Sequence, residues 1–106
     1  MSNDLDKVLL NKMEYEMSFK NGYNYVLYSD DPENLDEPTL DYTSFTSMGF
    51  YAGYEYGDWC YRAGLRFDVK PDNLLAEMDK RFRIDLDKHN EYMGILNKVN
   101  DPVKKM

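Results

Sequence analysis

Cys60 and His89 are each the only residue of their type in the chain, and together they could form a thiolate–imidazole pair for nucleophilic catalysis. Cys60 falls on the apolar face of one predicted helix and His89 on the apolar edge of another, which is typical of structural residues. Two such side chains are too few for a zinc site, and one cysteine cannot form an internal disulfide. We expect neither residue to react or to bind a metal.

Carboxylates are the most concentrated chemistry of the chain, and they gather in residues 29–40, SDDPENLDEPTL. The two prolines and the absence of apolar periodicity predict a loop. A calcium loop would need the pattern D-x-[DN]-x-[DN]-G, and this segment has no glycine for the sharp turn. The sequence therefore predicts a solvated acidic loop and no metal site. Its acids, with one just beyond the loop, are Asp30, Asp31, Glu33, Asp36, Glu37 and Asp41.

No other pattern indicates catalysis. Neither of the glycine-rich phosphate-binding patterns occurs. The carboxylate pairs Glu14 with Glu16 and Asp85 with Asp87 are spaced by two, so neither pair shares a helix face. We expect a protein that is not an enzyme and that needs no cofactor.

The charge of the chain excludes some classes of partner. Its 106 residues are enough for a single domain, and its formal net charge is −7. Residues 1–65 contribute −8 and residues 66–106 contribute +1. An acidic surface repels nucleic-acid phosphates and anionic lipids and favours basic protein partners. Its aromatic residues alternate with acids, unlike those of a groove for single-stranded nucleic acid. We expect neither direct nucleic-acid binding nor membrane binding.

Cellular location is predicted from what the chain lacks. Met1 is followed by polar and acidic residues, unlike a secretory signal, and no apolar run approaches the ~20 residues that cross a bilayer. With a single cysteine, the chain suits a reducing compartment. We expect a cytoplasmic protein.

Residues 41–64 form the strongest helical pattern of the chain. Apolar positions recur every three or four residues, as on the buried face of an amphipathic helix, at Phe45, Met48, Ala52, Tyr56, Trp59, Cys60 and Ala63. Gly49, Gly53 and Gly57 form a second line, although each interior glycine costs roughly 1 kcal/mol relative to alanine. We expect these glycines to admit another backbone, in an internal helix crossing or a dimer contact. Asp41 or Thr43 should cap this helix and Gly64 should end it.

Residues 13–28 are consistent with two structures. Alternation in MEYEMSF, the Asn21-Gly22 turn and the strand formers of YNYVLY predict a β-hairpin. However, residues 17–25 and 48–56 share the pattern MxFxxGYxY at an offset of 31 residues. Since the second copy lies within the strong helical pattern, we favour a helix over about 4–28, crossing the central helix as an antiparallel pair. A cap at 2–4 starts it, and its predicted apolar face is Leu5, Val8, Leu9, Met13 and Met17.

The sequence also predicts helix in the last third of the chain. Residues 65–69 alternate and predict a short extended segment, and Pro71 suits the first turn of a third helix. The apolar spacing continues to Val99 with a possible break near Asp85, and residues 103–106 should fray. We predict one all-α domain over 1–106, a bundle of three or four helices with the acidic loop after the first; the alternative is an α+β fold with the hairpin.

The side of the central helix opposite its apolar face carries tyrosines where lysine or glutamate is usual. Tyrosines there offer rigid contact area with a polar tip, as at protein interfaces; this side comprises Tyr51, Tyr54, Glu55, Asp58 and Tyr61. Small size, acidity and tyrosine content resemble, in composition, the small phage-type inhibitors of restriction or CRISPR machinery. That resemblance implies a DNA mimic that occupies a nucleic-acid-binding site on another protein. We expect the tyrosines to supply its specificity, and its working charges to be Asp30, Asp31, Glu33, Asp36, Glu37, Asp41, Glu55 and Asp58.

A second function is consistent with the same residues. A structural or regulatory helical subunit would self-associate through the glycine line and the tyrosine side of the central helix, with the loop acids serving only solubility. A third, a small ligand held between helices near Trp59, has no specific residue in its favour.

Overall fold

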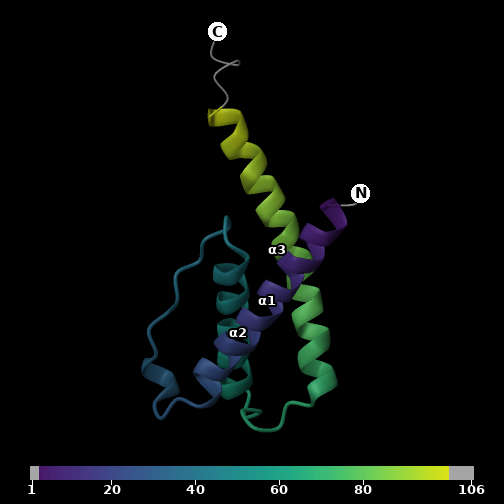
Figure 1. Ribbon diagram of the computed structural model, residues 1–106. Coiled ribbons are helices and arrows are strands. Elements are labelled where there is room, and N and C mark those ends of the chain that lie inside the picture. Colours follow the sequence, from purple (N-terminus) through teal and green to yellow (C-terminus); the bar gives the residue numbers. More distant parts are fainter. Residues whose placement is uncertain (1–2, 101–106) are drawn as a thin grey trace.

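The computed structural model describes residues 3–100, with side chains for residues 6–98. It contains three α-helices, α1 (Asn3–Leu27), α2 (Phe45–Arg62) and α3 (Pro71–Asn100), and a short 3-10 helix, η1 (Pro32–Asn34), within the loop between α1 and α2 (Figure 1). No strand occurs in the described range. The predicted all-α bundle is therefore confirmed, and the hairpin alternative is wrong.

The face of α1 that packs inward differs from the predicted one. Tyr15, Phe19, Tyr23 and Val26 are buried at helical spacing. Val8, Leu9, Met13 and Met17 are all more than two-fifths exposed, so the predicted apolar face is wrong. The side chain of Leu5 lies outside the described range. Both the buried residues and the predicted ones have helical spacing. The buried set packs inward because it lies on the same side of α1 as Gly22, where α2 crosses.

The crossing of α1 and α2 is close because glycines remove side chains from it. A Cβ added at Gly53 would lie 2.0 Å from the Phe19 carbonyl oxygen, and one added at Gly49 would lie 2.3 Å from that of Tyr15. At Gly57 the nearest atom would be Cβ of Val26, at 3.0 Å. Each later glycine of α2 therefore contacts a later residue of α1.

The two helices thus run parallel, and the predicted antiparallel pairing is wrong. Both run from top to bottom in Figure 1. A short connection would have forced an antiparallel pair. Here residues 28–44 run back beside α2, so that α2 begins near the middle of α1 (Figure 1).

The repeated sequence pattern has a structural counterpart. Gly22 of α1 meets Phe50 of α2 as Gly53 of α2 meets Phe19 of α1: in both cases an added Cβ would lie 2.0 Å from the carbonyl oxygen. Since Gly22 corresponds to Gly53 and Phe19 to Phe50 in the repeat, the crossing is pseudo-twofold.

Aromatic side chains extend this relation to both sides of the crossing. On one side Tyr56 lies 6.3 Å from Phe19 and 5.9 Å from Tyr23 between ring centroids. On the other side the equivalent separations, from Tyr25, are 5.6 Å to Phe50 and 6.3 Å to Tyr54. We call these sets the inner trio (Phe19, Tyr23, Tyr56) and the outer trio (Phe50, Tyr54, Tyr25).

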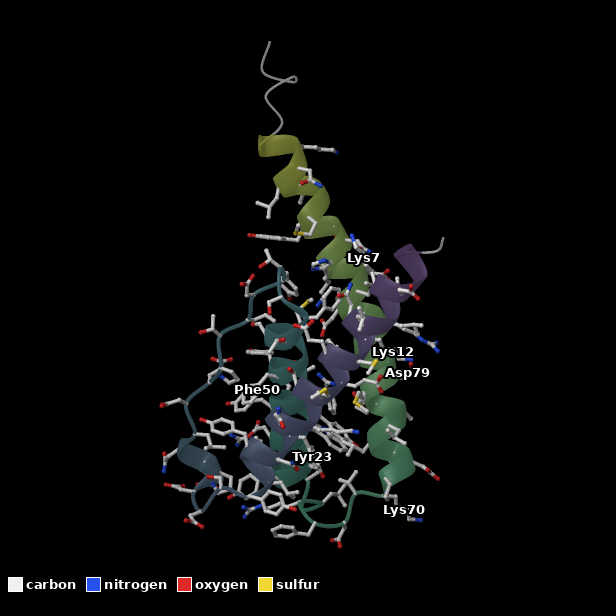
Figure 2. All side chains as sticks on the ribbon, in the orientation of Figure 1. Lys7, Lys12, Tyr23, Phe50, Lys70 and Asp79 are labelled. Carbon is white, nitrogen blue, oxygen red and sulfur yellow. The ribbon has the colours of Figure 1, made fainter. Side chains whose placement is uncertain are left out.

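Different segments cover the two trios. α3 supplies Met78 and Phe82 to the core on the inner side, where Phe19 is fully buried. The loop after α1 runs along the other side of α2, the side on which Phe50 lies (Figure 2). α3 passes through Asp85 without the predicted break.

The ends of α2 combine predicted and unexpected features. Ser44, not Asp41 or Thr43, caps the helix by accepting a hydrogen bond from the Ser47 N–H at 3.1 Å. Gly64 follows its C-terminus with φ of +76°, the left-handed conformation expected there.

Two further expectations near the C-terminus of α2 are wrong. Residues 65–68 form a turn, with the Asp68 N–H donating to the Leu65 carbonyl, not an extended segment. Trp59 is 56 % exposed and Ala63 is exposed. At this end α3 stands apart from α2, and a cleft of about 490 Å³ separates Trp59 from the first turns of α3. The expected start at Ser2 and the expected fraying of residues 103–106 lie outside the described residues.

Candidate functional site

The acidic loop is tied to the tyrosine side of α2. The Tyr51 hydroxyl donates to Oε1 of Glu37 at 2.6 Å, and the Tyr61 hydroxyl donates to Oε1 of Glu33 at 3.3 Å. Tyr25 of α1 adds a third tie, to the Asp36 carbonyl at 3.2 Å. The structure thus brings predicted loop acids and predicted helix tyrosines together. We call this surface the acid–tyrosine face; it comprises Glu33, Asp36, Glu37, Tyr51, Tyr54, Asp58 and Tyr61.

A groove of about 440 Å³ runs along this face, between the loop and α2. Its lining combines the rings of Tyr51, Tyr54 and the exposed Trp59 with three carboxylates and two guanidinium groups, those of Glu37, Glu55, Asp58, Arg62 and Arg81. The carboxylates outnumber the guanidinium groups by one, so the lining keeps a net negative charge beside its aromatic rings. This chemistry suits a partner that presents cationic side chains with apolar stems, such as lysine and arginine.

The tyrosines act as neutral donors to the carboxylates. The hydrogen bond to Glu37 is the main reason that the pKa of Tyr51 is raised to about 12. Burial is the main reason that the pKa values of Tyr54 and Tyr61 are raised. Because the hydroxyls keep their protons at neutral pH, the negative charge of the face resides on the carboxylates.

Two predicted working charges are paired within the chain. Asp58 bonds Arg62 at 2.9 Å, and Glu55 bonds Arg81 of α3 at 3.2 Å. These exposed pairs are worth little for stability, but they reduce the charge offered to a partner.

The remaining predicted acids lie along the loop. Asp30 is exposed, Asp31 accepts a bond from the Asn34 side chain at 2.7 Å, and Asp36 uses its backbone carbonyl toward Tyr25. Asp41 accepts from the Thr43 N–H at 2.9 Å, a bond that lowers the pKa of Asp41, and it stands at the start of α2, away from the groove. The predicted set is therefore a strip along α2 and not a single cluster.

Gly49, Gly53 and Gly57 are placed in the internal crossing. All three are buried against α1, as the added-Cβ distances above show. In this structure the glycine line therefore serves contacts within one chain and leaves no surface for a partner.

A hydrogen bond between the buried Tyr15 and the partly buried Asp85 was not predicted from the sequence. The Tyr15 hydroxyl donates to Oδ2 of Asp85 across α1 and α3 at 2.5 Å. Burial raises the pKa of both groups. Asp85 also lines a cleft of about 430 Å³ between α2 and α3, beside Arg81 and Lys88. In the sequence, the four-residue spacing between Tyr15 and Phe19 indicates that the two share one face of a helix.

Cys60 of α2 and His89 of α3 lie near opposite ends of α2. Cys60 is buried near its C-terminus, and burial is the main cause of its raised pKa. His89 packs on Phe45, the first residue of α2, with ring centroids 4.5 Å apart, and its Nδ1 lies 2.5 Å from the Tyr42 carbonyl oxygen. Fifteen helical residues separate Phe45 from Cys60, a rise of about 22 Å. The two side chains do not form a catalytic pair.

Among the side chains of residues 6–98, no group of three or more His, Cys, Asp or Glu is arranged for a metal ion. No helix within residues 3–100 is long and apolar enough to span a membrane. Comparison with protein-family models, curated proteins and solved structures finds no match to this chain.

Proposed function

We propose that this protein is a non-enzymatic binding module whose acid–tyrosine face docks onto a basic protein surface. The observation that carries the proposal is the pair of tyrosine–carboxylate bonds, Tyr51–Glu37 and Tyr61–Glu33, along one side of α2. Loop carboxylates that are held against a helix by hydrogen bonds present negative charge at limited conformational cost. Flanking rings supply apolar contact area.

Charge suggests what the module displaces. The first 65 residues carry −8, and they include the whole acid–tyrosine face. A protein surface that binds phosphates is rich in lysine and arginine, and its charge is complementary to such a face. We infer that the module acts as an inhibitor that occupies a nucleic-acid-binding site of another protein, as a DNA mimic does.

Capture from a nuclease-treated bacterial lysate tests this proposal, with three forms of the immobilised protein. The face variant converts four loop acids to their amides: Glu33, Asp36 and Glu37 of the acid–tyrosine face, and the neighbouring Asp30. The matched control converts four exposed acids elsewhere and so has the same net charge: Asp68, Asp72, Asp87 and Glu91.

The proposal expects a nucleic-acid-handling protein that is captured by the wild type and the control and is lost with the face variant. Added duplex DNA or RNA should compete for that protein, and affinity should fall steeply as salt rises. If both variants lost capture equally, net charge alone would explain the binding, and the acid–tyrosine face would not be needed. An affinity unchanged over a tenfold range of salt would refute mimicry.

A further inference from the structure

The outward face of α1 carries apolar side chains that no part of the described chain covers. Leu9, Leu10, Met13 and Met17 are 52 %, 63 %, 58 % and 65 % exposed. Met13 is nine residues from Gly22, which at about 100° per residue puts the two on opposite sides of α1. Since Gly22 meets α2, Met13 faces away from α2.

The third helix leaves this face uncovered as well. α3 approaches α1 from another side, where Lys12 pairs with Asp79 at 3.2 Å (Figure 2) and Tyr15 reaches Asp85. A contiguous apolar patch on a soluble surface marks an interaction site. Methionine adapts its shape to a partner, which suits a contact between surfaces of modest size.

Charges at the two ends of this face indicate what covers it. Asp6 and Lys20 are exposed, and among the described side chains neither forms an ion pair. Each is seven residues from Met13, one before it and one after it, which is a rise of about 10 Å along α1. By helical angle both lie within about 20° of Met13.

We propose that a second copy of this chain packs on this face, with the two α1 helices antiparallel and a twofold axis at Met13. This arrangement places Asp6 of each copy beside Lys20 of the second copy, and Leu9 beside Met17 of the second copy. A parallel arrangement would place like charges together, Asp6 against Asp6 and Lys20 against Lys20. The contact is isologous and closed, as in most dimers. It is independent of the proposed function, because the acid–tyrosine face lies on α2 and the loop before it.

Sedimentation equilibrium with charge reversals tests the pairing. Asp6→Lys or Lys20→Asp alone converts both intermolecular pairs of the dimer to like charges, and we expect Kd to rise about tenfold. The double variant with both reversals restores opposite charges and should return Kd to near the wild-type value. Matched single reversals at exposed positions of α3, Asp87→Lys and Lys98→Asp, should leave Kd unchanged.

Cysteine cross-linking locates the axis independently. Met13→Cys should form a disulfide-linked dimer on air oxidation, since a residue at the axis meets its own copy. Lys98→Cys, at an exposed position of α3, should not cross-link at the same concentration. Circular dichroism confirms that each variant is folded.

Three results would overturn the proposal: a wild type that is monomeric at 100 µM, a double reversal no tighter than the single ones, or a Met13→Cys variant that cross-links no faster than Lys98→Cys.

Discussion

Replacing Gly53 with alanine is the sharpest perturbation of this fold. The new Cβ would lie 2.0 Å from the Phe19 carbonyl oxygen, whereas a close C···O contact is about 3.3 Å. The obstacle is the backbone of a helix, so no side-chain rotation relieves it. α1 and α2 must separate by more than about 1 Å at the crossing, which forfeits much of the dispersion energy of the atoms in contact.

Two opposing terms set the size of the effect. Alanine is favoured over glycine in a helix by about 1 kcal/mol. Overpacking costs typically 1–3 kcal/mol and more where the neighbours cannot move. We expect Gly53→Ala to lower the free energy of unfolding by about 2 kcal/mol. Because this contact lies within one chain, the oligomeric size should not change.

Gly94 provides the matched control. It lies in the exposed interior of α3, where nothing is within 4 Å of an added Cβ. Gly94→Ala should therefore stabilise the protein by about 0.5–1 kcal/mol through helix propensity alone. Urea unfolding followed by circular dichroism measures both variants.

The pseudo-twofold crossing adds a coupling test. Gly22→Ala meets the Phe50 carbonyl as Gly53→Ala meets that of Phe19, so either change separates the same two helices. The double variant should therefore lose less stability than the two single losses added together. A Gly53→Ala variant as stable as the wild type, or one that changes oligomeric size, would refute this account of the crossing.

Two ionisable pairs give further predictions. Burial raises the pKa of Asp85 in the folded protein above its ordinary 3.8. The stability that the protonated carboxyl contributes is therefore complete below pH 3.8 and is lost as the pH rises through the pKa of the folded state. As the pH rises from 3.8 through this raised pKa, the free energy of unfolding of Asp85→Asn, measured in urea titrations, should increase relative to that of the wild type. A decrease relative to the wild type would contradict the burial argument. The pKa of Tyr51, raised from 10.0 to about 12, predicts a contribution present below pH 10 and lost toward pH 12. The stability difference between the wild type and Tyr51→Phe should shrink over that range; a difference constant with pH would rule out a role for the Glu37 bond.

The sequence predicted those features that depend on local spacing. Glycines at positions 49, 53 and 57 required a close backbone, and the repeat around Gly22 required that both copies share one conformation. Both inferences concern neighbours along a single helix, where periodicity determines which residues share a face. The Asn21-Gly22 turn signal failed because Gly22 is needed for the crossing rather than for a turn.

Features that depend on contacts between distant segments were beyond the sequence. α1 carries two apolar stripes, and only the approach of α2 decides that Phe19 is buried while Met17 is exposed. The direction of the crossing depends on the path of the long loop, which has no periodic signal. The Tyr15–Asp85 bond joins residues 70 positions apart. The acid–tyrosine face was predicted as two separate features, a loop and a helix side, and the hydrogen bonds between them required the structure.

The two trios show how one sequence pattern serves two purposes. Each has the same rings around the same crossing, but α3 makes the inner trio part of the core, whereas an acidic loop accompanies the outer trio. Under the proposed function, a basic partner that approaches the outer trio would meet the loop carboxylates first, so charge would govern encounter and the rings would govern retention.

The two proposed surfaces can be separated experimentally because they share no residue: one is the outward face of α1, and the other is formed by α2 and the acidic loop. Met13→Glu puts two carboxylates at the proposed twofold axis and should abolish self-association, while capture of a basic partner by the acid–tyrosine face persists. Neutralising Asp30, Glu33, Asp36 and Glu37 should have the opposite result, leaving the sedimentation Kd unchanged and capture lost. If Met13→Glu also abolished capture while circular dichroism showed a folded protein, dimerisation would be required for binding, and the two faces would act as one site.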